Sequence, residues 1–390
     1  MAALKQIIAL DNTKKHTEKA MMQKLKKFEN DIRTDIQDAK KMTLHAHIFT
    51  DIDSRLWLKQ TPNKRPEFEG VRFTIGLDID PNADVLLVYT RASWSIPTTL
   101  PKMRTIFLAG EPEDIHPYSA AFLNQFGTVI APGEKQLTTQ RIDHNYCSIW
   151  FVGVDFENLD AALGYDHFKA LQSPPKDDKI SIVTSTKAST EYHRIRLAFI
   201  EILKDKIPDH ITLYGRGHKP ISDKMDAMLP HKYHLSLENG AGKYSWTEKL
   251  SDPLLCWALP FYAGCVNVQD ELPADSIVPI NLKDPDAAIN AMMQARKDNL
   301  WDQRKKTLAK TRDLILHDFN IMGLIARLTK GKADLPFEAT SRLIRAERSL
   351  WPEKGSRGSV PLYLLRSALL AINPNIELRA AKMKQARKNR

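Results

Sequence analysis

Apolar residues follow two different spacings along the chain. In residues 17–42 they recur every three or four positions, which predicts one amphipathic helix. This helix would pack on its own domain or serve as a partner or dimer helix. From Leu44 onward, short apolar runs alternate with Pro, Asn, Asp and Gly, which is typical of strands separated by turns. The expected strands are 44–49, 71–77, 85–89, 105–109 and 128–131, with a short helix at 119–126.

A second series of strands and helices begins after a polar, proline-containing break at 171–178. Strand, helix, strand in regular alternation predicts a parallel sheet. The expected strands are 180–184, 211–214, 233–237, 259–263 and 277–282, and the expected helices are 192–204, 246–258, 286–294 and 302–328. The sequence therefore predicts an α/β fold class, with two Rossmann-like domains and helical N- and C-terminal extensions. The expected boundaries are 1–43, 44–170, 176–330 and 331–390.

The composition of the chain agrees with two folded cores, and its cysteines indicate the cellular compartment. A chain of 390 residues that is 43% hydrophobic can bury more than one core. No apolar run reaches the roughly 20 residues that a membrane-spanning helix needs. The three cysteines form no CxxC pair, which favours a reducing, cytoplasmic compartment.

The chain is basic, with a formal net charge of +10. From Leu378 to Arg390 it carries lysines and arginines but no acid. A basic surface attracts phosphate as nucleic acid, anionic lipid or a nucleotide diphosphate. This tail is therefore a candidate contact to the inner membrane face. No nucleic-acid-binding module is recognisable, so no nucleic acid is expected as a partner, and a basic nucleic-acid-binding protein is only a remote alternative.

One segment combines the end of a predicted strand with the start of a predicted helix. Glu238 and Asn239 end the strand, and Thr247, Glu248 and Lys249 open the helix. In a doubly wound domain these ends meet at the ligand crevice, where unpaired N–H groups of the first helical turn favour an anion such as pyrophosphate. Thr247 suits the helix cap, Glu248 suits the first turn or a ribose hydroxyl, and Lys249 can neutralise a phosphate.

Several segments share their order and spacing with one enzyme family. They are Leu237-Glu238-Asn239, Trp246-Thr247-Glu248-Lys249-Leu250, residues 258–264, Tyr214-Gly215-Arg216-Gly217 and the helical stretch 193–199. Together they resemble the donor-binding signature of the alpha-1,3-fucosyltransferase family, of the bacterial type in glycosyltransferase family ten. The resemblance implies the GT-B glycosyltransferase architecture, with an acceptor-binding domain at 44–170 and a nucleotide-sugar-binding domain at 176–330. It also implies inverting transfer of fucose from GDP-fucose to a hydroxyl of an acceptor glycan or glycolipid, in an alpha-1,3 linkage.

The same resemblance implies roles for individual residues. The implied donor-binding residues are Arg196, Glu238, Asn239, Tyr244, Thr247, Glu248 and Lys249. Arg196 and Lys249 would contact the diphosphate, because fixed cations stabilise the charge that develops on the leaving GDP. The turn Gly110-Glu111-Pro112 would present Glu111 as the general base. An inverting transfer needs a base because the acceptor hydroxyl must lose its proton as it attacks.

No cofactor and no metal are expected, because cations of the chain itself can stabilise the leaving group. The strings Asp51-Ile52-Asp53 and Asp78-Ile79-Asp80 lie in the domain opposite the donor signature and are not expected to bind metal, although a divalent cation could still stimulate the reaction. Where the family carries an aromatic residue, this chain has Ser245. Another nucleotide-sugar donor, with the same fold and mechanism, therefore stays open as an alternative, and so does a homodimer.

Overall fold

The computed structural model describes residues 43–90, 93–113, 115–184, 191–215, 217–350 and 360–388. The predicted helix at 17–42 and Arg216 of the predicted donor signature lie outside the described residues. Within the described residues, the strands form one seven-stranded sheet, one five-stranded sheet and a two-stranded pair. The predicted α/β class with two mainly parallel sheets is confirmed.

The seven-stranded sheet comes from the first third of the chain. In spatial order its strands are β2 (Glu67–Phe68), β3 (Val71–Gly76), β1 (Leu44–Phe49), β4 (Val85–Tyr89), β6 (Thr105–Leu108), β7 (Thr128–Ile130) and β8 (Gln140–Arg141). From β1 through β8 the neighbours pair in parallel, whereas β2 and β3 pair antiparallel. Every residue of β4, β6 and β7 is buried, as expected for parallel strands covered on both faces. All five strands predicted in this region are confirmed.

The five-stranded sheet is parallel throughout. In spatial order its strands are β10 (Ile211–Tyr214), β9 (Asp177–Val183), β11 (His231–Leu237), β12 (Leu259–Ala263) and β13 (Val278–Pro279). Of these five strands β9 comes first along the chain, and it lies between the second, β10, and the third, β11, so the direction of winding reverses between β9 and β11. Such a topological switch point opens a crevice at the carboxyl ends of the two strands.

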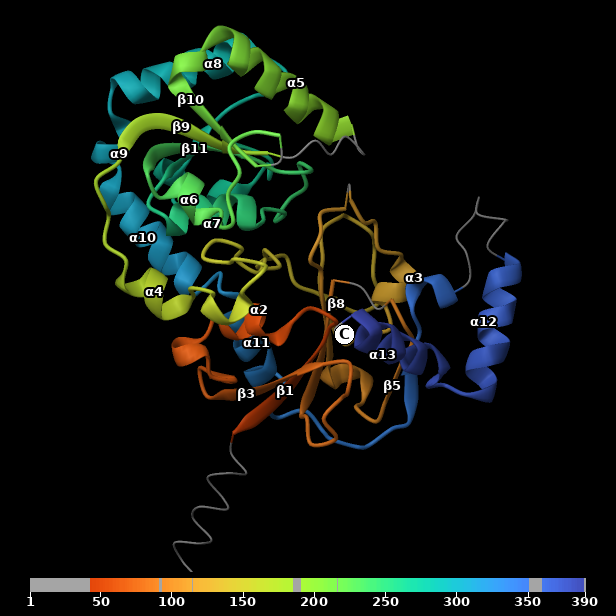
Figure 1. Cartoon of the computed structure of the whole chain (residues 1–390). Helices are drawn as coiled ribbons and strands as arrows, with labels where there is room; N and C mark the ends of the chain where they lie inside the picture. The colour runs from red at the N-terminus through yellow and green to blue at the C-terminus, as the bar shows by residue number, and fades with distance from the viewer. Residues whose placement is uncertain are drawn as a thin grey trace, which may run out of the picture. The chain divides into compact units, whose positions relative to one another are not determined.

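Helices cover both faces of the five-stranded sheet. Figure 1 shows α5 (Glu191–Lys206) and α8 (Pro285–Lys297) on one side of it, and α6 (Met225–Met228) and α7 (Glu248–Leu255) on the other. Among the described residues up to 330, the other α-helices are α2 (Ser54–Leu58), α3 (Ala120–Leu123), α4 (Tyr165–Ala170), α9 (Leu300–Gln303), α10 (Lys305–Leu316) and α11 (Ile321–Lys330). The predicted helix at 246–258 is shorter in the structure, because Thr247 caps α7 and the helix ends at Leu255.

The prediction of one continuous helix over 302–328 is wrong. The structure divides this stretch between α9, α10 and α11. Asn320 separates the last two: its Oδ1 accepts hydrogen bonds from the backbone N–H groups of Met322 and Gly323, at 2.9 and 3.3 Å. An asparagine cap starts a new helix even where the apolar spacing continues. As a consequence, α11 packs against β2 and β3 of the seven-stranded sheet.

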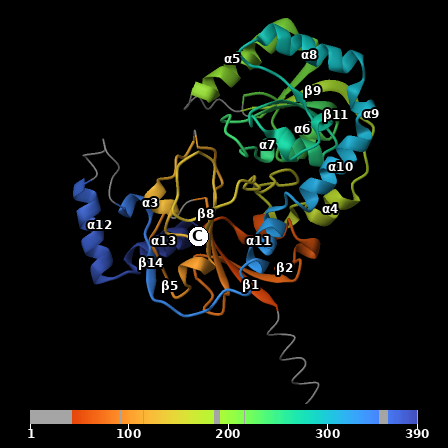
Figure 2. The same ribbon diagram turned by 180° about the vertical axis from the view of Figure 1, so that it is seen from behind.

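Residues 331–390, predicted as a helical extension, also contribute a strand. β14 (Arg342–Ile344) pairs antiparallel with β5 (Ile96–Thr98), as Figure 2 shows. The carboxylate of Glu347 then accepts a hydrogen bond from the backbone N–H of Ser119 at 2.6 Å. Two helices complete the described chain, α12 (Val360–Ile372) and α13 (Ile376–Lys388). In the part of the chain that the structure describes, no helix combines the length and apolarity needed to cross a membrane.

Candidate functional site

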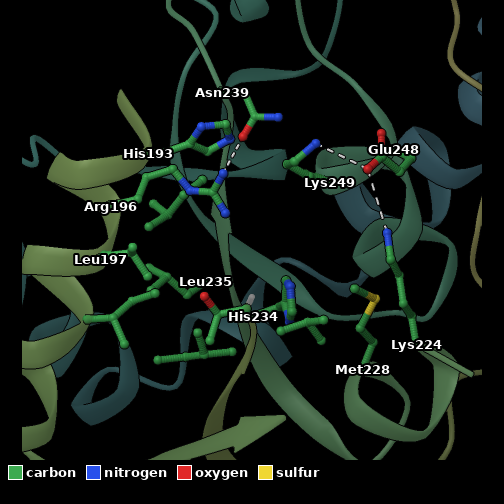
Figure 3. Close-up of a pocket in the computed structure, with 15 residues that line it drawn as sticks. His193, Arg196, Leu197, Lys224, Met228, His234, Leu235, Asn239, Glu248 and Lys249 are labelled. Atoms are coloured by element: carbon green, nitrogen blue, oxygen red, sulfur yellow. Dashed lines mark hydrogen bonds and ion pairs between the residues drawn. The ribbon is translucent and has the colours of Figure 1, made fainter. Parts of the chain in front are cut away.

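A cavity of about 370 Å³ opens at the switch point of the five-stranded sheet. Its walls come from the carboxyl ends of β9 and β11, from α5 and α6, and from the start of α7 (Figure 3). We call it the switch-point cavity. Its lining residues are Ile182, Val183, Thr184, His193, Arg196, Leu197, Ile200, Lys224, Met228, His234, Leu235, Leu237, Asn239, Glu248 and Lys249. The cavity falls within the volume range of small-molecule sites, and it combines an apolar floor with a few charged groups.

Two of the predicted donor-binding residues meet directly at one wall of the cavity. Arg196 projects from α5 and Asn239 follows β11, and Nη1 of Arg196 donates a hydrogen bond to Oδ1 of Asn239 (Figure 3). Burial lowers the pKa of Arg196, and the carboxylates of Glu238 and Glu248 oppose that shift. The Nε of Arg196 is buried and has no hydrogen-bond acceptor among the described residues. The guanidinium thus keeps hydrogen-bonding capacity that its contact with Asn239 does not use.

The opposite wall is the first turn of α7. Thr247 caps the helix, with its Oγ1 accepting from the backbone N–H of Lys249 at 3.4 Å. The Lys249 ammonium lies 3.1 Å from Oε1 of Glu248. Burial alone would lower the pKa of Lys249, but the negative charges of Glu248 and Glu238 raise it overall. Burial would likewise raise the pKa of Glu248, but Lys249 and Lys224 hold it down at about 2. Both side chains are therefore charged at physiological pH.

Glu238 holds the start of α7 through hydrogen bonds and does not line the cavity. It is fully buried, and its two carboxylate oxygens accept from the backbone N–H and the hydroxyl of Thr247, both at 2.7 Å. Neither Glu238 nor Thr247 lines the cavity, and their contact with a ligand stays a prediction. Together they fix the direction in which α7 begins.

Gly264 leaves the space that the Glu238 side chain occupies. A Cβ at this position would lie 2.4 Å from Cγ and 2.6 Å from Cβ of Glu238. We therefore expect Gly264→Ala to lower the free energy of unfolding by about 1–3 kcal/mol, because both groups are confined. Urea unfolding would measure this loss. Gly242→Ala is the matched control, since its nearest neighbour is Ser245 Cβ at 3.5 Å. Equal stability of the two variants would contradict the packing argument.

Glu111 follows β6 on a loop that packs closely against the end of β4. A Cβ added to Gly110 would lie 2.2 Å from Oγ1 of Thr90 and 2.9 Å from Cζ of Tyr89. Burial raises the pKa of Tyr89, and the charges of Tyr118, Glu111 and Glu248 raise it further. The charges of Glu111 and Glu248 thus act on the same phenol, although Glu111 does not line the switch-point cavity. Its role as a general base stays a prediction.

Tyr244 is the predicted donor residue that the structure places elsewhere. It lines a second cavity of about 720 Å³, together with residues that include Glu134, Arg141 and Lys243. Its backbone has a φ of 53° and is held at both polar groups: its N–H donates to Asn267 Oδ1 at 2.8 Å, and its carbonyl accepts from Asn145 Nδ2 at 3.1 Å. Tyr244 therefore lines this second cavity and not the cavity that holds Lys249, which sequence spacing alone could not reveal.

The structure adds Lys224 and His234 to the site, and the sequence analysis assigned neither of them to it. His234 lies on β11, with Nδ1 at 2.8 Å from the hydroxyl of Ser181. Burial, assisted by the charge of Lys224, lowers the pKa of His234 to about 3, so the imidazole is neutral at physiological pH. The sequence did offer one indication that His234 could belong to a site, because it is a polar residue within the expected strand 233–237, whose other residues are mostly apolar. Lys224 lies in a polar loop before α6, where a lysine is ordinarily a solvated surface residue.

No protein-family model and no curated protein matches the sequence. Among solved structures, the chain is similar to an alpha1,3-fucosyltransferase with GDP-fucose, with 18% identity over 67% of this chain and 81% of the other, at a TM-score of 0.40. An alpha1,3-fucosyltransferase with GDP gives 18% identity over 71% and 91% of the chains, at 0.41. A trehalose-6-phosphate synthase gives 10% identity over 67% and 74%, at 0.41. Similarities at this level do not establish a family, so any function must be argued from the site.

Proposed function

We propose that this protein is a glycosyltransferase of the GT-B type that binds a nucleotide sugar in the switch-point cavity. The observation that supports this most strongly is the convergence of Arg196, Asn239, Glu248 and Lys249 on one cavity at the carboxyl ends of parallel strands. Two cations and a capped helix start suit a diphosphate, and a carboxylate beside them suits sugar hydroxyls. The resemblance of the sequence segments around these residues to alpha-1,3-fucosyltransferases makes GDP-fucose the proposed donor.

The proposed reaction is an inverting transfer. An acceptor hydroxyl oxygen forms a bond to the anomeric carbon of the donor while the bond from that carbon to the diphosphate oxygen breaks. The hydroxyl proton passes to Glu111, and the bonding electron pair leaves with the nucleoside diphosphate. Arg196 and Lys249 stabilise the negative charge that accumulates on the leaving oxygens. The proposed acceptor is a hydroxyl of a glycan or glycolipid, and the step needs no metal.

Calorimetric titration tests the donor site directly. Purified full-length protein should bind GDP and GDP-fucose, and GDP-mannose and UDP-glucose serve as competing donors. Slow release of GDP from GDP-fucose, with water as the acceptor, would establish the chemistry. Preference for another nucleotide sugar would favour the alternative donor within the same fold. Absence of binding to every nucleoside diphosphate tested would contradict the proposal.

We also propose that the protein works in the cytoplasm, at the membrane surface, through its C-terminal helices. On α12, Leu364 and Leu365 are each 58% exposed and Ile372 is 82% exposed. The segment from Leu378 to Arg390 is basic, and its positive charges would attract anionic lipid headgroups. An exposed apolar helix face next to a basic segment is the arrangement of interfacial helices.

Substitutions test this membrane contact better than truncation does. The carboxylate of Glu377 on α13 accepts from Ser95 N–H at 2.8 Å and from the Ser349 hydroxyl at 3.0 Å, so removing α13 would disturb the fold. We expect Leu365→Gln combined with Ile372→Gln to reduce co-sedimentation with anionic vesicles about tenfold or more. Met103→Gln, at a residue that is 50% exposed, should leave binding unchanged. Equal binding of both variants would reject membrane contact through α12.

A further inference from the structure

Lys224 occupies an unusual position between two carboxylates. Its ammonium lies 3.6 Å from Oε1 of Glu248 and 3.3 Å from Oδ2 of Asp252. It also lies 5.3 Å from the centre of the Phe151 ring. The side chain is 27% exposed and lines the switch-point cavity, on the side away from Arg196 (Figure 3).

The two carboxylates differ in their access to a ligand. Glu248 lines the cavity and is 15% exposed. Asp252 is fully buried, and its Oδ1 accepts from the backbone N–H of Phe151 at 3.1 Å. Lys224 therefore pairs with two carboxylates of different kinds. It neutralises Asp252, which a ligand cannot reach, and it restrains Glu248, which lines the cavity.

Glu248 is held from two directions. Its Oε1 lies 3.1 Å from the Lys249 ammonium and 3.6 Å from the Lys224 ammonium, and the two lysines come from different elements. Two cations near one oxygen restrain the position of that oxygen and keep the group ionised. An ionised, oriented carboxylate accepts two hydrogen bonds from a vicinal diol, which is the chemistry that a ribose presents.

We propose that Lys224 is a positioning residue for nucleotide binding, which orients Glu248 so that its carboxylate accepts hydrogen bonds from the ribose diol of the donor. This inference rests on the proposed donor site and assigns one part of that site to one part of the ligand. Arg196 and Lys249 serve the diphosphate, whereas the pair of Lys224 and Glu248 serves the ribose. Met228, beside Lys224, belongs to the apolar part of the same wall.

The test compares GDP with 2′,3′-dideoxy-GDP, which lacks the diol but keeps the diphosphate and the base. Wild-type protein should bind GDP about 10- to 100-fold more tightly than the dideoxy nucleotide in calorimetry, since the lost hydrogen bonds involve a charged group. Lys224→Met alone would leave Asp252 buried and unpaired, so the informative variant is Lys224→Met with Asp252→Asn. This double variant should lose most of the preference, with GDP binding weakened about tenfold and dideoxy-GDP binding nearly unchanged. Lys224→Arg, which keeps a cation in place, should retain most of it.

The possible results separate the role of Lys224 from the existence of the donor site. A double variant that keeps the wild-type preference would overturn the role of Lys224, because neutralising Asp252 would then explain its presence. Equal loss for both nucleotides would also overturn it, because Lys224 would then act on the diphosphate. Wild-type protein that binds both nucleotides equally would show that no diol is recognised. Wild-type protein that binds neither would instead remove the proposed donor site itself.

Discussion

Glu111→Gln is expected to lower the rate of GDP release from GDP-fucose by about 10²- to 10⁴-fold, the usual contribution of a positioned general base. Glutamine keeps the size and shape of the side chain but cannot take a proton from the attacking hydroxyl. Donor affinity should stay close to that of the wild type, because Glu111 does not line the switch-point cavity. Steady-state kinetics with calorimetry on the same preparations would separate the two quantities.

Glu113→Gln is the matched control for this prediction. Glu113 lies two residues further along the same loop and carries the same charge, and it lies 3.9 Å from the Lys135 ammonium. Its substitution should change the rate of GDP release by less than about threefold, since surface ion pairs contribute little. Similar rates for both variants would mean that charge on the loop, and not proton transfer by Glu111, is what matters. A Glu111→Gln rate within threefold of the wild type would remove the base assignment.

Local sequence patterns predicted the strands well because parallel strands are continuous apolar runs. β1, β4 and β10 match their predicted bounds, since the residues flanking each run are polar or break the strand, and β12 matches its bounds as well. Helix ends were predicted less well, because the apolar spacing of 302–328 continues across Asn320 and hides the cap. β14 had no signal of its own, because a three-residue strand is defined by its partner β5 and not by its own spacing.

Part of the site was also predictable from local sequence patterns. Arg196, Asn239, Glu248 and Lys249 lie next to strand ends and helix starts, so topology alone brings them to one crevice, and they line one cavity in the structure. Tyr244 does not line this cavity, and its left-handed backbone is held by Asn145 and Asn267, which lie far from it in the sequence. No sequence pattern indicated Lys224 as a site residue, because its place in the site depends on two carboxylates that only folding brings next to it.

Lys249→Met is expected to weaken GDP binding by about 10- to 100-fold, because a charge-assisted contact to phosphate typically contributes 1.5–3 kcal/mol. The same change should cost about 2 kcal/mol of folding stability, since it removes the nearest cation from Glu248 and its largest opposing charge from the buried Glu238. Calorimetry and urea unfolding at pH 7 measure the two effects. Lys243→Met is the control, because its ion pair with Glu134 at 3.6 Å joins side chains that are 63% and 87% exposed.

The stability effect of Lys249→Met should depend on pH with a definite sign. The folded-state pKa of Glu248 is lowered from 4.5 to about 2, so its favourable interaction with Lys249 is present above pH 4.5 and is lost as the pH falls toward 2. The difference in unfolding free energy between wild type and Lys249→Met should therefore be largest at pH 7 and should shrink as the pH falls to 3.5, with the decrease at the upper end of this range coming from Glu238, whose pKa is raised by burial. Lys243→Met should show no such trend in the same urea titrations. A difference that stays level or grows on acidification would mean that Lys249 does not hold Glu248 as an anion, and the cavity would then lack the fixed charge pair on which diphosphate and ribose binding both depend.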